Sequence, residues 1–380
     1  MKLVFAPDSF KGSLRSAEMT EILCEEAAKV FPEAQLVPIP VADGGEGTVE
    51  ALTAACGGEL HSMTVISPDG SPVQAVYGLM DSGMTAVIEM AQASGLPLMG
   101  DHPDPMHATS LGTGLMIRHC LEHGARKLYV GLGGSATNDG GMGMLTALGA
   151  RFLDADGNIL TGSGSELQLI DRIDLDGLMP EIAQAEIHAI ADVNNPLLGP
   201  TGATYIYGPQ KGATPDLLPV LENGMAHYAQ LLETIVGKDI HSLPGSGAAG
   251  GMGAALYGVL NANISAGIEA MLETVRFDDH LKGADLVITG EGRLDEQALL
   301  FGKVCGVIAA RCAAANVPVI ALVGSMGPGA AALEDIGMSS IMTTVNAPMT
   351  LKEAIRDARK LYADAAARIF RMIRIGRRMQ

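Results

Sequence analysis

Short apolar runs recur along the chain, and a loop rich in glycine or in acidic residues follows each of them. The pairs are KLVFA before PDSFKGS, LVPIPVA before DGGEGT, KLYVGL before GGSATNDGG, IHAIA before DVNNPLLG, DLVIT before GEGRLDE and VPVIALVG before SMGPG. Continuous apolar runs of this length are typical of strands that are buried on both faces. The pattern therefore predicts a set of parallel strands that end in polar loops.

Amphipathic stretches between these runs predict helices. Ser16 is expected to cap the first, whose apolar face is Met19, Ile22, Leu23, Ala27 and Val30. Further helices are predicted at 111–124, at 304–315 and from 351 to about 375. Strands that alternate with helices indicate an α/β fold with a parallel sheet. Ligands of such sheets bind beyond the carboxyl ends of the strands, where the polar loops are expected to lie.

Residues 59–90 break the alternation. Two turns, Pro-Asp-Gly and Asp-Ser-Gly, separate short strands in this stretch, which predicts an antiparallel meander. The start and the end of the chain both read as strand–helix units. We therefore predict two domains: a discontinuous α/β domain of residues 1–58 and 265–380, and a mixed α/β domain of residues 59–264 inserted into it.

Composition excludes several classes of protein. The 380 residues carry a formal charge of −18, so the surface repels the phosphates of nucleic acid and of anionic lipid, and we expect neither as a partner. The five cysteines form no CxxC pair, which is typical of a reducing cytoplasm. The N-terminal run meets Pro7 and Asp8 too early for a signal peptide, and charged or proline residues interrupt the later apolar stretches.

The stretch YVGLGGSATNDGG, from Tyr129 to Gly141, allows three interpretations. It contains GxGxxA, and Asp154 follows at about the spacing of a dinucleotide-binding fingerprint. A structural turn is the second interpretation. In the third, successive backbone N–H groups and nearby hydroxyls form an anion site, and Asp139 holds a metal or orients Asn138. The predicted phosphate ligands are Gly133, Gly134, Ser135, Thr137, Asn138, Gly250 and Gly251, the last two from a second glycine-rich stretch.

Acidic residues supply the candidate metal ligands and base. Asp43 and Glu46 share one tight turn and are expected to bind Mg²⁺, although capping of the following helix explains them equally well. Asp192 directly follows an apolar strand, so a partly desolvated general base is expected there. The substrate ligands we expect elsewhere are Asp8, Ser9, Asn195, Lys211, Glu291 and Arg293, with Lys11 and Asp295 as catalytic residues.

Seven of these motifs together resemble one family. APDSFKGSL, VADGGEGT, GLGGSATNDGG, DVNNPL, GPQKG, GAAGGMGAAL and GEGRLDEQ occur in the order that is typical of bacterial glycerate kinases of the GarK/GlxK type, glycerate kinase type I. The resemblance covers essentially the whole chain. It implies ATP-dependent phosphorylation of D-glycerate, usually at the 2-hydroxyl. It also implies a flavodoxin-like domain with a domain resembling a restriction endonuclease inserted into it.

The chain departs from the family pattern after Gln297. Family members usually continue with Ser or Thr and then Gly-Lys-x-Pro, whereas this chain has Ala298, an extra residue before Gly302 and Cys305 in place of proline. The departure leaves the role of Lys303 open. The remaining acids, Glu291 and Asp295, still predict an active enzyme.

The expected mechanism follows from what phosphoryl transfer needs, which is positioning and charge neutralisation. ATP and Mg²⁺ are expected in the cleft between the domains, with phosphates on the two glycine-rich loops and D-glycerate beside the cationic residues. A homodimer is left open. The competing hypotheses are phosphorylation at the 3-hydroxyl, a dinucleotide-dependent oxidoreductase, and a carboxylate-binding protein without activity.

Overall fold

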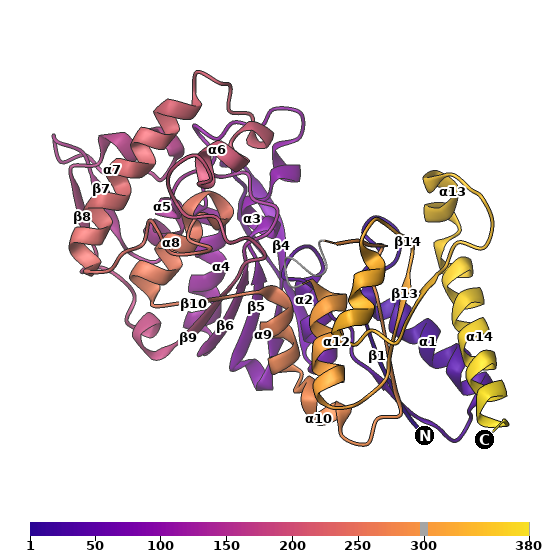
Figure 1. Cartoon of the computed structure of the whole chain (residues 1–380). Helices are drawn as coiled ribbons and strands as arrows, with labels where there is room; N and C mark the ends of the chain where they lie inside the picture. Colours follow the sequence, from indigo (N-terminus) through magenta and orange to yellow (C-terminus); the bar gives the residue numbers. More distant parts are fainter. Residues whose placement is uncertain (297–302, 380) are drawn as a thin grey trace. The chain divides into compact units, whose positions relative to one another are not determined.

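The computed structural model describes residues 1–296 and 303–379, and these residues divide into two compact units (Figure 1). Unit 1 comprises Met1–Asp43, Glu50–Gly57 and Ile268–Gln380, and unit 2 comprises Gly44–Val49 and Gly58–Gly267. The altered residues Gln297–Gly302 lie outside the described part. Among the described residues, no helix combines the length and the apolar character that crossing a membrane requires.

Unit 1 contains a fully parallel sheet of five strands in the order β15-β13-β11-β1-β2. Counted along the unit, this order is 2-1-3-4-5, the flavodoxin-like arrangement, which confirms the predicted fold class. The strands are β1 (Lys2–Pro7), β2 (Gln35–Pro38), β11 (Leu286–Gly290), β13 (Val319–Val323) and β15 (Ser340–Thr343). A short parallel pair, β12 (Arg293–Leu294) and β14 (Ser325–Met326), lies beyond this sheet.

Helices cover both faces of this sheet because its strands are apolar on both sides. α1 (Ser16–Val30) and α14 (Ala358–Arg377) share one core with β1 and β11, in which Phe5 contacts Phe370 edge to face. α12 (Val304–Ala314) packs on β11 (Figure 1). The unit also holds α9 (Gly267–Thr274), α10 (Phe277–Leu281), α13 (Leu351–Arg356) and the 3-10 turn η6 (Ala330–Ile336).

Two predictions for these helices need correction. Ser16 is the first residue of α1 rather than its cap, and its hydroxyl donates to the Pro7 carbonyl while it accepts from the Val41 N–H. Arg15 holds the cap position. The predicted closing helix is two helices, because Thr350 caps the short α13 and the backbone leaves helical geometry at Asp357.

Unit 2 contains a mixed sheet of six strands in the order β10-β9-β6-β5-β4-β3. β3 (Glu59–Ile66), β4 (Pro72–Met80) and β5 (Thr85–Glu89) form the expected antiparallel meander. The parallel half adds β6 (Lys127–Gly131), β9 (Glu186–Ile190) and β10 (Asn263–Ser265). A small antiparallel pair consists of β7 (Arg151–Leu153) and β8 (Arg172–Asp174).

The helices of unit 2 enclose a core that is rich in alanine and methionine. They are α2 (Thr48–Ala55, shared with unit 1), α3 (Ala91–Ser94), α4 (Leu111–Glu122), α5 (Met142–Ala147), α6 (Ala203–Tyr207), α7 (Leu218–Val236) and α8 (Ala248–Leu260). The 3-10 turns are η1 (Asp81–Gly83), η2 (Leu96–Met99), η3 (Gly164–Leu169), η4 (Pro180–Gln184) and η5 (Pro209–Lys211). Small side chains let α5 and α8 approach closely.

Candidate active site

Two acidic residues lie side by side directly after the ends of neighbouring strands in unit 1. Pro7 of β1 pairs with Gly290 of β11, so Asp8 and Glu291 are the next residues of adjacent parallel strands. The Asp8 N–H donates to the Gly290 carbonyl at 2.8 Å, which fixes the register at this point. The strand order reverses between β1 and β11, which makes this position the topological switch point of the sheet. Open α/β sheets bind ligands at such a point.

Burial and mutual repulsion keep both acids from ionising readily. Asp8 is 6% exposed, and burial raises its pKa to about 7, with the charges of Asp43 and Glu291 adding to the rise. Burial likewise raises the pKa of Glu291 to about 7, and Asp295 and Asp43 contribute. The Oε1 atom of Glu291 has no hydrogen-bond partner among the described residues. Clustered carboxylates with an unpartnered oxygen are suited to receive a cation or a hydroxyl group.

Cationic side chains surround this acidic group. The Nζ atom of Lys11 lies 3.0 Å from Oδ2 of Asp43, and the Nε atom of Arg293 lies 3.6 Å from Oδ2 of Asp295. Lys303 lowers the pKa of Glu291 by its charge. The side chains of Lys11 and Arg293 are 63% and 66% exposed, so both are accessible to an anionic ligand.

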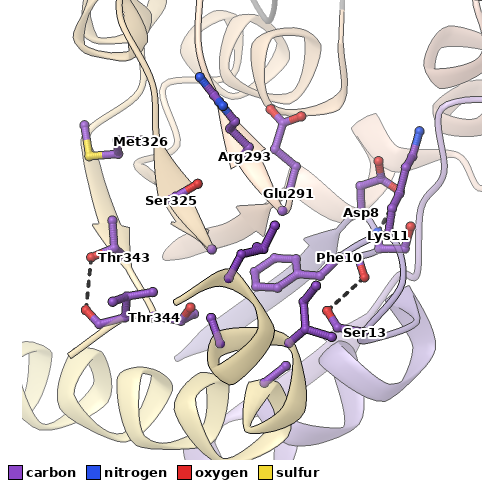
Figure 2. Close-up of a pocket in the computed structure, with 18 of the residues that line it drawn as sticks. Asp8, Phe10, Lys11, Ser13, Glu291, Arg293, Ser325, Met326, Thr343 and Thr344 are labelled. Carbon is purple, nitrogen blue, oxygen red and sulfur yellow. Dashed lines mark hydrogen bonds between the residues drawn. The ribbon is translucent and has the colours of Figure 1, made fainter. Parts of the chain in front are cut away.

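A pocket of about 920 Å³ opens over these residues, entirely within unit 1 (Figure 2). It brings together six of the predicted site residues, namely Asp8, Ser9, Lys11, Asp43, Glu291 and Arg293. Lys303 also lines it, and Asp295 is tied to it through Arg293. Loops that are far apart in the sequence thus meet at one edge of the sheet.

Five hydroxyl residues that line this pocket were not predicted from the sequence, namely Ser13, Ser325, Thr343, Thr344 and Thr350. Ser325 begins β14 shortly after the end of β13, Thr343 is the last residue of β15, and Thr344 follows it. The stretch SSIMTT is short and half polar, so it gave no clear strand signal, although position after a strand is the same signal that identified Asp8 and Glu291.

In unit 2, the carboxylate of Asp139 makes hydrogen bonds that stabilise the fold. Its carboxylate is fully buried and accepts from the N–H and hydroxyl of Ser110 at 2.8 and 2.6 Å, and from the N–H groups of Gly141 and Gly143 at 3.1 and 3.2 Å. Burial raises its pKa, and these hydrogen bonds oppose the rise. These contacts do not support the predicted metal ligand, because protein donors occupy both oxygens.

Lys211 is likewise an interior residue. It is 1% exposed, and its Nζ atom donates to the Thr137 carbonyl at 2.8 Å. Burial lowers the pKa of Lys211 to about 7, and the charge of Asp139 raises it in part. These contacts do not support the predicted substrate ligand, because the ammonium group supports the 133–141 loop from inside the domain.

Burial also overturns part of the predicted phosphate cradle. Thr137 and Asn138 are fully buried, and the Gly140 N–H donates to the Gly250 carbonyl. A Cβ atom at Gly250, where φ is +65°, would lie 2.0 Å from the Thr137 carbonyl oxygen. Gly250 and the similarly buried Gly251 are glycines because two backbone segments touch. Their burial does not support the predicted contact of these four residues with phosphate.

The outer part of the loop remains accessible. Gly134 is exposed, Gly133 is half-buried and Ser135 is 7% exposed. Gly44 lies at the same end of the sheet, and a Cβ atom there would come within 2.2 Å of Ile190. Phosphate binding by Gly133, Gly134 and Ser135 stays a prediction, as does cation binding by Glu46, which is exposed.

Asp192 and Asn195 follow β9. Asp192 is exposed rather than partly desolvated, and its Oδ1 accepts from the Gly267 N–H at 3.2 Å. Its role as base stays a prediction. The Asn195 amide donates to the Thr201 carbonyl and accepts from the Tyr207 hydroxyl, at 2.7 and 2.6 Å. These contacts show that the Asn195 side chain stabilises its own loop. They do not support a direct contact with substrate.

The dinucleotide interpretation is wrong on geometry. β6 ends at Gly131, but α5 begins only at Met142, so the glycines do not open into a helix that would hold a pyrophosphate. Asp154 instead accepts from the Asp156 and Asn158 N–H groups of its own turn, at 3.0 and 2.8 Å.

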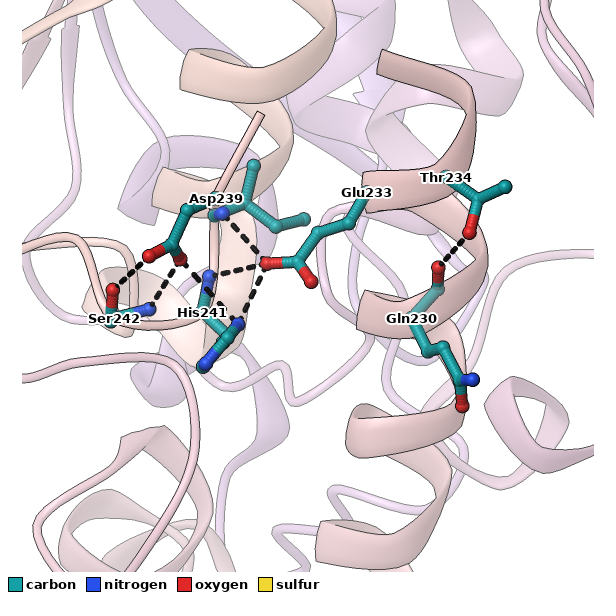
Figure 3. A network of polar contacts seen from close by, with 7 residues as sticks. Gln230, Glu233, Thr234, Asp239, His241 and Ser242 are labelled. Carbon is teal, nitrogen blue, oxygen red and sulfur yellow. Dashed lines mark hydrogen bonds and ion pairs between the residues drawn. The ribbon is translucent and has the colours of Figure 1, made fainter. Parts of the chain in front are cut away.

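A carboxylate–histidine cluster at the end of α7 has a structural explanation (Figure 3). Oε1 of Glu233 accepts from the Ile240 N–H at 2.8 Å and lies 2.7 Å from Nδ1 of His241. Asp239 lies 3.4 Å from the same nitrogen. The contacts close the loop after the helix, and the hydrogen bond to Glu233 raises the pKa of His241.

Comparisons with known proteins agree with one another. A family model described as "Glycerate kinase family" matches residues 3–374. The chain is 42% identical to a glycerate 2-kinase of Escherichia coli K12, over 100% of this chain and 99% of the relative. It is 43% identical to a glycerate kinase of Bacillus cereus, over 94% of each. A crystal structure of a proposed glycerate kinase 2 from Salmonella typhimurium LT2 matches with a TM-score of 0.91, at 39% identity, over 100% of this chain and 99% of that one.

Proposed function

The chain belongs to the glycerate kinase family, and we propose that it transfers the γ-phosphoryl group of ATP to the 2-hydroxyl of D-glycerate, giving 2-phosphoglycerate. The observation that carries the proposal is the pair of buried acids, Asp8 and Glu291, at the ends of adjacent strands with cations around them. Phosphoryl transfer concentrates negative charge on the phosphates, and such a site neutralises that charge.

The donor set fits Mg²⁺. The charges of Asp43 and Glu291 raise the pKa of Asp8, the charge of Asp43 raises the pKa of Glu291, and an oxygen of Glu291 lacks a partner among the described residues. Carboxylate oxygens are the ligands that Mg²⁺ prefers. These three residues would hold the ion, which supplies charge neutralisation for the nucleotide phosphates.

The protein's cations supply the remaining charge compensation. Lys11 and Arg293 are exposed on the pocket wall. Lys11 is paired with Asp43, so its ammonium group would be released when Asp43 engages the metal ion, whereas Arg293 is paired with Asp295, which is not one of the three proposed metal ligands. Lys11, Arg293 and Lys303 would bind phosphate or the carboxylate of D-glycerate. Asp192 stays the predicted acceptor of the hydroxyl proton. A homodimer and a cytoplasmic location also stay predictions.

Product analysis tests the proposal. The purified chain is mixed with ATP, MgCl₂ and D-glycerate, ADP release is followed, and the product is identified by ³¹P and ¹H NMR. We expect 2-phosphoglycerate. A 3-phosphoglycerate signal would move the reaction to the other hydroxyl, and ADP release that does not depend on D-glycerate would refute the assigned substrate.

A further inference from the structure

We propose that the apolar half of the pocket in unit 1 binds the adenine and ribose of ATP, with the triphosphate directed to the acids and cations at the other end. The inference rests on the proposed kinase function and specifies which part of which substrate this pocket takes. It assigns the base and the ribose to residues of unit 1.

The two ends of the pocket differ in chemistry (Figure 2). Asp8, Lys11 and Glu291 lie toward one side, whereas Met326 and Thr343 lie toward the other. Most of the lining residues between positions 325 and 358 are apolar, namely Met326, Val345, Met349, Leu351, Ala354, Ile355 and Ala358, and the others carry hydroxyl groups. An aromatic base is the part of a nucleotide that such a surface accommodates.

Exposure of this apolar surface is itself evidence for a ligand. Met326, Leu351 and Ile355 are 47%, 76% and 41% exposed, although they line a pocket. Single exposed apolar residues are common, but several around one concave site mark a binding surface. The core of unit 1 does not need them, because α14 already covers that face of the sheet with Tyr362 and Phe370.

The size of the pocket points to the nucleotide rather than to the acid. Cavities of about 300–1,000 Å³ hold drug-sized ligands, and this one is about 920 Å³. D-Glycerate has three carbons and no apolar group, so it neither fills the space nor matches its wall. A nucleoside triphosphate has both the required length and the required change from apolar to anionic.

Hydroxyl groups also line the pocket and could meet the hydroxyl groups of a ribose. Ser325 and Thr344 line it, and the Thr343 hydroxyl donates to the Val345 carbonyl only at the long distance of 3.5 Å. Ribose hydroxyls form hydrogen bonds with such side chains at the cost of little rearrangement. The pocket thus offers apolar side chains to the base, hydroxyl groups to the ribose, and acidic and cationic groups to the metal-bound phosphates.

Calorimetry on a matched pair of variants tests the proposal. Ile355→Glu places a charge at the apolar end, and Ile375→Glu makes the same change on the exposed surface of α14, outside the pocket. Each protein is titrated with the ATP analogue AMP-PNP and, separately, with inorganic tripolyphosphate, both with MgCl₂. Circular dichroism verifies the fold, and Leu351→Glu provides a second pocket variant.

We expect Ile355→Glu and Leu351→Glu to weaken AMP-PNP binding roughly tenfold or more while tripolyphosphate binding is unchanged, because only the base loses its contacts. Ile375→Glu should match the unmodified protein with both ligands. Unchanged AMP-PNP affinity in folded pocket variants would overturn the inference, as would a raised KM for D-glycerate with an unchanged KM for ATP. Nucleotide binding is measured without the acid, so these results stand even if D-glycerate proves not to be the acceptor.

Discussion

The Nζ atom of Lys211 donates a 2.8 Å hydrogen bond to the carbonyl oxygen of Thr137, inside unit 2 and 74 residues away along the chain. The lysine is buried, and its pKa falls to about 7 from 10.5 because the ammonium group has left water. This contact explains the conformation of the 133–141 loop and makes the stability of the protein depend on pH.

The sign of that dependence follows from proton binding. Between pH 7 and 10.5 the unfolded chain holds the proton on Lys211 and the folded chain does not. This group therefore makes the free energy of unfolding rise with pH, by up to about 1.4 kcal/mol per pH unit. Lys211→Met should flatten the rise, measured by urea unfolding at several pH values across this window. An equal slope in Lys211→Met and in the exposed-site control Lys352→Met would contradict the assignment.

Replacing Asp139 tests its structural role. Asn places an amide donor where the carboxylate now accepts four hydrogen bonds. We expect Asp139→Asn to lower the free energy of unfolding by about 2–4 kcal/mol, because buried N–H groups lose their acceptor. If stability were unchanged while the response to Mg²⁺ disappeared, Asp139 would return to the candidate metal ligands.

Added Mg²⁺ should stabilise the protein through the acids of unit 1. At a pH above 7, where Asp8 and Glu291 ionise, Mg²⁺ at roughly ten times its Kd adds about 1.4 kcal/mol to stability. Thermal melts with MgCl₂, compared with NaCl of equal ionic strength, should show the gain in the unmodified chain and lose it in Asp43→Asn. A gain that persists in Asp43→Asn would place the ion elsewhere.

The predicted base has its own test. Asp192→Asn keeps the size of the side chain, and its amide oxygen still accepts from the Gly267 N–H. Turnover should fall roughly 10²–10⁴-fold if the carboxylate removes the hydroxyl proton. Near-normal kcat in a steady-state assay would remove this assignment and leave the kinase function intact.

Local patterns predicted much of the fold and one half of the site. Buried parallel strands read as apolar runs, so the residues that follow them, Asp8 and Glu291 among them, were identified as functional from position alone. The meander of β3, β4 and β5 was equally readable, because turn residues separate its strands. Both features depend on neighbouring residues.

Long-range contacts account for what the sequence did not reveal. In the sequence, Gly250 and Thr137 have the surroundings of ligand-binding loop residues. The two segments contact each other in the fold, and the sequence of neither segment indicates that contact. The pairing of β1 with β11 is of the same kind, since paired residues are 283 positions apart in the sequence, as Leu3 and Leu286 are. Thr343 was overlooked because β15 is short and half polar.

The most direct test of the account is D-glycerate-dependent ADP release by Glu291→Gln beside the unmodified chain. Glutamine keeps the shape of the side chain but removes the charge that we assign to the metal ion and the phosphates. We expect kcat/KM of Glu291→Gln to fall roughly 10²-fold or more. Its thermal midpoint should be retained or raised, because the variant no longer buries a charge. Turnover equal to that of the unmodified chain would contradict the account.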